Sequence, residues 1–172
     1  CCMPNNKPVN DSRSVTEHIV GRARATGLAR VYPVGAATVG LKGEQLSEYA
    51  DMKEAGIVAV SDDGRCVMDA GLMRRALEYV KAFDGVIAQH AQEPSLTTGA
   101  QMNEGALSGE LGLTGWPPAA EEAIIARDML LAAHVQSRVH VCHVSTAGSV
   151  ELVRWAKDKG WPVTAEVTPL HL

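Results

Sequence analysis

Three side chains that can bind a metal ion stand at the ends of apolar stretches of the sequence. Asp63 is the second residue after IVAVS, His90 ends VIAQH, and His143 follows RVHVC. Two imidazoles and one carboxylate are a common ligand set for zinc, manganese or iron. A carboxylate can bridge two ions through its two oxygens, whereas a neutral imidazole binds one ion through one nitrogen. We therefore expect a hydrolase-type centre in which Asp63 bridges a metal pair and His90 and His143 bind one of the ions.

The stretch RVHVCHVSTAGSVELVRWA, residues 138–156, indicates how His143 is positioned. Its first residues alternate with the period of two of a β-strand, and the hydroxyl residues that follow can cap a helix. His143 therefore stands at the carboxyl end of a strand, where parallel α/β folds place their chemistry. Continued alternation would turn Val139 and Val141 to the same side as His143, and His140 to the opposite side.

Six predicted strands alternate with five predicted helices along the chain. Gly27 can end the first helix, and Pro118 suits the first turn of the fourth. The strands are 1–5, 29–34, 57–61, 86–90, 138–144 and 162–168, and the helices are 13–26, 44–55, 69–83, 118–135 and 147–159. Strict alternation predicts a parallel sheet with helical crossovers.

The predicted fold is α/β, a partial TIM (β/α)8 barrel with six parallel strands and five intervening helices. A complete barrel needs about 250 residues, whereas this chain has 172. We expect residues 1–172 to form a single incomplete barrel domain, an internal fragment that lacks the first and last barrel strands. Strands 1–5 and 162–168 should then be sheet edges. The loop 91–117 should be long, mobile and close to the metal face.

The composition is that of a globular protein with a substantial core, since 46% of the residues are hydrophobic and 21% are charged. A net charge of −4 gives no reason to expect a nucleic-acid or membrane partner. No apolar run approaches the roughly 20 residues that span a bilayer. The cysteines form no CxxC pair, so we expect Cys1, Cys2, Cys66 and Cys142 to be reduced in a cytoplasmic protein.

Structural roles compete with the metal-binding interpretation at each position. Asp62-Asp63-Gly64 is more often a turn than a ligand, and a single histidine such as His90 is as often a hydrogen-bonded core residue as a functional one. What favours a metal site is the occurrence of three such groups at three strand ends. No role is assigned to His18, His134 or His140, and spacing leaves the role of His171 undecided.

Seven segments of the chain together carry a family resemblance. They read CCMPNNKPVNDS, AVSDDG, QHAQE, MNEGALSGELGL, EEAIIARD, HVCHVSTAGSVE and EVTPLHL. In this order and spacing they resemble the motifs of the bacterial dihydroorotases of the zinc-dependent amidohydrolase superfamily. The resemblance implies the reversible, zinc-dependent cyclisation of N-carbamoyl-L-aspartate to L-dihydroorotate in pyrimidine biosynthesis.

The resemblance also implies roles for individual residues. Asp63 matches the carboxylate that bridges two Zn²⁺ ions, at a position where many relatives in the superfamily have a carboxylated lysine. His90 and His143 match two ligands of the second ion, and Asn5 matches a residue that binds the substrate carboxylate. The family's TPHHL reads TPLHL here, but Leu170 is not at a ligand position, so we expect little effect.

Further ligands that the resemblance implies do not occur in this sequence. A His-x-His pair should precede it on the first barrel strand, and the aspartate that acts as general acid and base should follow it on the last. We therefore expect the fragment by itself to be inactive and the activity to belong to a full-length parent. Its partners would be the small-molecule substrate, with a homo-oligomer or a complex with aspartate transcarbamoylase left open.

Two alternatives to a dihydroorotase stay open at this point. One is another cyclic amidohydrolase, such as a hydantoinase or allantoinase, against which the aspartate at position 63 argues. The other is a non-catalytic dihydroorotase-like partner of aspartate transcarbamoylase. Such copies usually lose metal ligands, whereas Asp63, His90 and His143 are all present.

Overall fold

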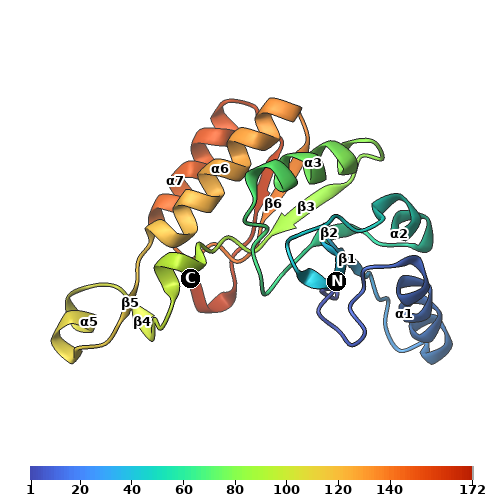
Figure 1. Ribbon diagram of the computed structural model, residues 1–172, viewed down its shortest axis with the longest axis horizontal. Helices are drawn as coiled ribbons and strands as arrows, with labels where there is room; N and C mark the ends of the chain where they lie inside the picture. Colours follow the sequence, from blue (N-terminus) through green and yellow to red (C-terminus); the bar gives the residue numbers. More distant parts are fainter. Residues whose placement is uncertain (172) are drawn as a thin grey trace.

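A five-stranded parallel sheet with helices between its strands forms the centre of the computed structural model, which describes residues 1–171 (Figure 1). The order across the sheet is β1 (Val34–Ala36), β2 (Ala59–Ser61), β3 (Val86–Gln89), β6 (Arg138–Val141) and β7 (Val163–Ala165). The predicted α/β class with a parallel sheet is confirmed. Strand β7 is at one edge, as predicted for the last strand of the chain.

Helices connect the strands in the predicted order, and the second of them begins at Tyr49, five residues later than the predicted start at residue 44. They are α1 (Arg13–Thr26), α2 (Tyr49–Ala55), α3 (Ala70–Lys81), α6 (Ala119–Val135) and α7 (Ala147–Asp158). Helix α1 ends at Gly27, whose φ of +68° is the left-handed conformation that glycine adopts without a steric penalty. Within residues 1–171, no helix combines the length and the apolarity needed to cross a membrane.

The first predicted strand is the main difference from the expected architecture. Residues 1–5 contribute only one parallel bridge, between Cys2 and Pro33, in which the Val34 N–H donates to the Cys2 carbonyl at 2.9 Å. Strand β1 accordingly begins at Val34, later than the predicted 29–34. Proline has no N–H to donate, so Pro4 and Pro33 limit the ladder on both segments.

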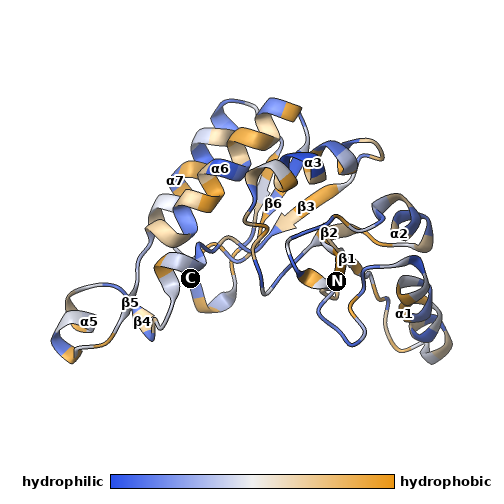
Figure 2. Ribbon diagram, in the orientation of Figure 1, coloured by the Kyte–Doolittle hydropathy of each residue, from blue (hydrophilic) through white to orange (hydrophobic). Residues whose placement is uncertain are grey.

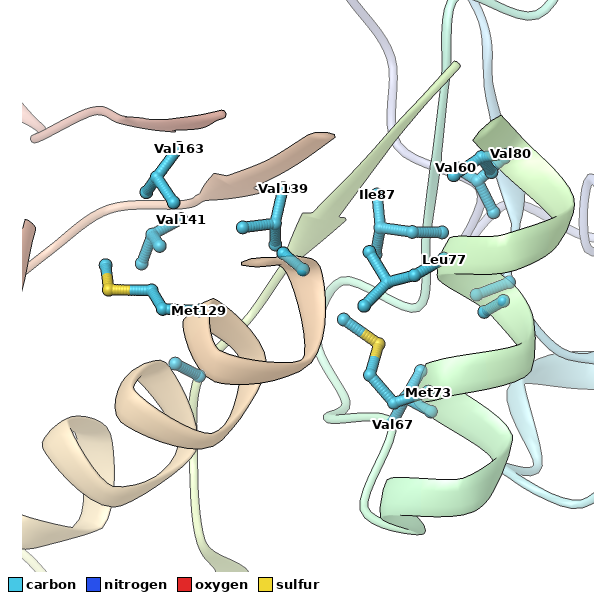
Figure 3. Close-up of a cluster of buried hydrophobic side chains, with 14 of the residues drawn as sticks. Val60, Val67, Met73, Leu77, Val80, Ile87, Met129, Val139, Val141 and Val163 are labelled. Carbon is cyan, nitrogen blue, oxygen red and sulfur yellow. The ribbon is translucent and has the colours of Figure 1, made fainter. Parts of the chain in front are cut away.

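The hydrophobic core lies between the sheet and helices α2, α3, α6 and α7. Figure 3 shows the part of it that α3 and α6 form with the strands. Met73 and Leu77 of α3 and Met129 of α6 are fully buried there. The strand residues that meet them are Val60, Ile87, Val139, Val141 and Val163. Figure 2 shows the same pattern as apolar residues along β3 and α6. Because alternate strand residues face the helices, the others face the opposite side of the sheet, where the barrel interior is expected.

The predicted loop 91–117 contains short elements of its own. Helix α4 (Pro94–Thr97) comes first, and β4 (Met102–Asn103), α5 (Ala106–Leu111) and β5 (Gly115–Trp116) follow. Strands β4 and β5 pair with each other and not with the main sheet. We call residues 102–116 the arm, because they extend away from the helices and the sheet (Figure 1).

Candidate metal centre

Asp63, His90 and His143 follow three strands that are neighbours in the sheet. Asp63 lies two residues after β2, His90 directly after β3, and His143 two residues after β6. The sheet places β3 between β2 and β6. Since the strands are parallel, their carboxyl ends lie at one edge, and the three side chains meet there.

The separations between the three ligand atoms suit a small tetrahedral ion. His143 Nε2 lies 3.0 Å from His90 Nδ1 and 3.3 Å from Asp63 Oδ1, and His90 Nδ1 lies 3.9 Å from Asp63 Oδ1. Zinc bonds of about 2.0–2.1 Å place the ligands of a tetrahedral site about 3.3–3.4 Å apart. The three donors therefore fit a zinc ion with small side-chain adjustments.

The charges in this group favour binding of a cation. The hydrogen bond from His143 is the main cause that lowers the pKa of Asp63, and the same bond raises the pKa of His143. The proton on His143 Nε2 is thus stabilised by the Asp63 carboxylate, and it lies between that carboxylate and the His90 ring. A metal ion would compete with that proton for the same lone pair.

The direction of His143 does not follow the alternation of its strand. Val139 and Val141 pack against the helices, so the expectation that they share the direction of His143 is wrong, and so is the expectation that His140 points away from the barrel interior. His140 lies on the opposite face of the sheet and hydrogen-bonds to Thr164 at 2.8 Å. The cause is local, since His143 has a left-handed φ of +38° that interrupts the extended backbone.

The two aspartates of the Asp-Asp-Gly motif have separate roles. Asp62 is 2% exposed, and its carboxylate accepts hydrogen bonds from the Thr38 N–H, at 2.9 Å, and the Thr38 hydroxyl. Burial raises the pKa of Asp62 although these hydrogen bonds oppose the shift. Asp62 thus joins the segment after β2 to the segment after β1, while Asp63 faces the imidazoles.

Asn5 lies beside the same loop. Its side chain is exposed, and a Cβ atom built on Gly64 would be 3.9 Å from Asn5 Nδ2. This places the amide next to the residue that follows Asp63. The substrate-binding role expected for Asn5 stays a prediction.

A cavity of about 550 Å³ adjoins the two histidines, and its lining includes His90, His143, Trp116, Glu121, Thr146 and His171. Trp116 belongs to the arm, so the prediction that the loop 91–117 lies close to this face is confirmed. The predicted mobility of the loop stays a prediction. His171, which spacing left undecided, lines the cavity, whereas Leu170 is 94% exposed.

Sequence reasoning missed two polar residues that hold the histidines. The His90 Nε2 atom lies 2.9 Å from Gln92 Oε1. The Glu121 carboxylate accepts hydrogen bonds from Ser145 and Thr146, just after His143. A hydroxyl-rich helix start after His143 was visible in the sequence, but nothing indicated that its partner would be a residue of α6.

A second group of potential ligands lies on the inner face of β6 and β7. It consists of His140, Cys142 and Glu166, whose ligand atoms are within 4.8 Å of one another. Burial raises the pKa of the Cys142 thiol to about 12, which keeps it protonated at neutral pH. The His140 ring already pairs with Thr164 and Glu166, so side-chain contacts account for this group.

Comparisons with known proteins agree with these features. The family model described as "Dihydro-orotase-like" matches residues 1–149. A dihydroorotase from Leifsonia xyli is 66% identical over 99% of this chain, and one from Mycobacterium tuberculosis is 55% identical over 99%. The chain spans about two fifths of these relatives, 39% of the first and 40% of the second.

The solved structures that resemble this fold include hydantoinases. The L-hydantoinase from Arthrobacter aurescens has a TM-score of 0.75 at 21% identity. The aligned region covers 97% of this chain and 38% of the hydantoinase chain. A D-hydantoinase has a TM-score of 0.70 at 18% identity, and the aligned region covers 99% of this chain and 38% of the D-hydantoinase chain. At such identities the likeness concerns the fold, and it confirms the partial (β/α)8 barrel.

Proposed function

This chain belongs to the dihydro-orotase-like family, and we propose that it forms part of a zinc-dependent dihydroorotase. The reaction is the reversible cyclisation of N-carbamoyl-L-aspartate to L-dihydroorotate. The observation that carries the proposal is the meeting of Asp63, His90 and His143 at three neighbouring strand ends, with separations that suit zinc. Relatives named dihydroorotase, 66% and 55% identical to this chain, support it.

His90, His143 and Asp63 would hold one zinc ion. Asp63 would also contribute to binding a second ion, as the resemblance to the dihydroorotases implies. When bound, zinc supplies a water molecule of lowered pKa and polarises the carbonyl under attack. Asp63 holds negative charge at the centre because the hydrogen bond from His143 lowers its pKa.

Asn5 and the cavity are the proposed substrate-binding features. The Asn5 amide can donate from Nδ2 to a carboxylate, and both the open and the cyclic substrate carry one. The cavity of about 550 Å³ beside His90 and His143 lies within the range of small-molecule sites. Trp116 of the arm would cover one side of the bound ring and exclude water.

We propose that residues 1–172 are one incomplete barrel domain and are inactive alone. One continuous core joins strands β2, β3, β6 and β7 to helices α2, α3, α6 and α7, which supports a single unit. The chain supplies three ligands for one ion and a shared carboxylate for the other. A cytoplasmic location, a homo-oligomer and a complex with aspartate transcarbamoylase remain predictions.

The test uses the full-length protein and an assay of dihydroorotate ring opening. We expect Asp63→Ala and His90→Ala to abolish turnover and to lower the bound zinc, whereas His18→Ala, on the exposed face of α1, should keep both. Turnover that survives Asp63→Ala would refute the bridging role. A substrate panel with hydantoin and allantoin separates the dihydroorotase from the other cyclic amidohydrolases.

A further inference from the structure

His90 uses both ring nitrogens, and they face different partners. Nδ1 points to the candidate centre, 3.0 Å from His143 Nε2 and 3.9 Å from Asp63 Oδ1. Nε2 lies on the other side of the ring, 2.9 Å from Oε1 of Gln92. A neutral imidazole carries one proton, so the partner of Nε2 decides which nitrogen keeps a free lone pair.

The orientation of the Gln92 amide is fixed by a third residue. Gln92 Nε2 donates to the Thr97 hydroxyl at 2.8 Å, and Thr97 is only 7% exposed. The Thr97 hydroxyl can in turn donate to the carbonyl of Glu93 or Pro94, each at 3.4 Å. An amide nitrogen can only donate and an amide oxygen can only accept. With its nitrogen held by Thr97, Gln92 presents its oxygen to His90.

We propose that Gln92 is a positioning residue that selects the Nε2–H tautomer of His90, so that the Nδ1 lone pair faces the metal. The Gln92 oxygen accepts the Nε2 proton and also fixes the plane of the ring. Ligand histidines commonly donate their second N–H to such an acceptor, and loss of the acceptor weakens metal binding. This inference rests on the proposed metal site.

The same contact joins the metal centre to the base of the arm. Thr97 is the last residue of α4, and the arm starts five residues later at Met102. Displacement of α4 would move Thr97, release the Gln92 amide and remove the selection of the tautomer. His90 is thus held by the segment that leads to the wall of the cavity formed by Trp116.

The experiment measures the tautomer and the zinc affinity separately in the full-length protein. After removal of metal with a chelator, the ¹⁵N shifts of labelled histidine at about pH 8.5 report the tautomer, with His90 assigned from its loss in His90→Asn. We expect Nε2–H in the wild type and a mixture in Gln92→Leu. Competition with a chromophoric chelator should show Zn²⁺ affinity reduced about 10- to 100-fold in Gln92→Leu.

Three further variants make the test specific. Gln92→Glu keeps an acceptor for the Nε2 proton and should restore the tautomer and the affinity. Thr97→Val leaves Gln92 in place but frees its amide, and should give a mixed tautomer with a smaller loss of affinity. Gln101→Leu makes the same change at an exposed residue and should leave both measurements unchanged.

The proposal is overturned if Gln92→Leu, or Thr97→Val where Gln92→Leu fails to fold, keeps the wild-type tautomer and affinity. A wild-type protein that binds no Zn²⁺ would instead refute the proposed function. The tautomer spectra would still decide the role of Gln92 in that case, since they are recorded without metal.

Discussion

Glu121 and Thr146 are joined by two hydrogen bonds, in which the Thr146 N–H and hydroxyl both donate to Oε2 of the Glu121 carboxylate, at 3.1 and 3.0 Å. The same carboxylate accepts from the Ser145 N–H at 2.9 Å and from the Ser149 hydroxyl. Glu121 is 7% exposed. One side chain of α6 thus holds the start of α7 and the turn that carries His143.

Replacement of this carboxylate should therefore destabilise the protein. In Glu121→Ala the Ser145, Thr146 and Ser149 donors lose a charged acceptor that is itself buried, and we expect the free energy of unfolding to fall by about 2–4 kcal/mol. Glu121→Gln keeps one acceptor oxygen and should cost less. Urea unfolding measures both. Glu151→Ala, at an exposed position of α7, is the control and should be nearly neutral. A loss below about 0.5 kcal/mol in Glu121→Ala would contradict this role.

The Asp63–His143 pair should make stability depend on pH when metal is removed with a chelator. The pKa of His143 is raised in the fold, so its contribution is complete below about pH 6.5 and is lost as the pH rises through the folded pKa. The pKa of Asp63 is lowered, so its contribution is present above about pH 4 and is lost as the pH falls through the folded pKa. The pair should stabilise most between about pH 4 and 6.5.

Both side chains are partly exposed, so the contribution should stay below about 1 kcal/mol. Urea unfolding at several pH values, with His143→Asn compared with the wild type, measures it. His18→Asn is the matched control and should follow the wild-type curve. If the free energy of unfolding of His143→Asn differed from that of the wild type by the same amount at pH 5 and at pH 9, the stabilising Asp63–His143 pair would be ruled out.

Ionisation of the buried Asp128 should destabilise the folded protein at neutral pH. Burial raises its pKa from 3.8 to about 6, although Arg127 and Gln89 both hydrogen-bond to the carboxylate. A raised pKa means that the folded state binds the proton more tightly, so this contribution is greatest below pH 3.8 and is lost as the pH rises through about 6.

The variant Asp128→Asn tests this dependence. Relative to wild type, its free energy of unfolding should increase between pH 4 and pH 7, by on the order of 2–3 kcal/mol. The difference between the two proteins removes the effect of all other titrating groups. A difference that stays constant over this pH range would show that Asp128 titrates normally.

Gly115 should be essential for the arm. A Cβ at Gly115 would lie 2.6 Å from the Cα of Glu104, a backbone atom that cannot move without separating β4 from β5. We expect Gly115→Ala to reduce the local stability of residues 102–116 by about 1–3 kcal/mol, measured by amide hydrogen exchange. Gly109→Ala is the control, since nothing lies within 4 Å of its Cβ and alanine favours the helix. Unchanged exchange in Gly115→Ala would contradict the clash.

Local signals in the sequence predicted most of the fold. A capping residue at position 11 or 12 and the glycine at position 27 predict a helix over 13–26, and α1 is observed at Arg13–Thr26. The prediction of a strand at residues 1–5 is wrong, although its apolar residues favour a strand. Strand pairing also depends on the neighbouring segment, where Pro33 has no N–H to donate. The arm carries only two-residue strands, too short for any alternation to be visible.

The meeting of Asp63, His90 and His143 could be predicted because parallel strands bring their carboxyl ends together. The direction of His143 could not, since its positive φ depends on contacts after the strand. Gln92 and Glu121 were missed for different reasons. The role proposed for Gln92 depends on the orientation of its side-chain amide between His90 and Thr97, which no local sequence pattern indicates. Glu121 contacts residues 24 to 28 positions later in the chain, and only the packing of α6 on α7 makes that pair.

The position of the three ligands on separate strands has a consequence for unfolding. An ion held by His90, His143 and Asp63 would tie together residues that are 53 and 80 positions apart in the chain. It would act as a removable cross-link that shrinks the conformational freedom of the unfolded polypeptide, much as a disulfide does. Resistance to proteolysis would then rise with the supply of free zinc, and the lifetime of the protein would report the metal status of its surroundings.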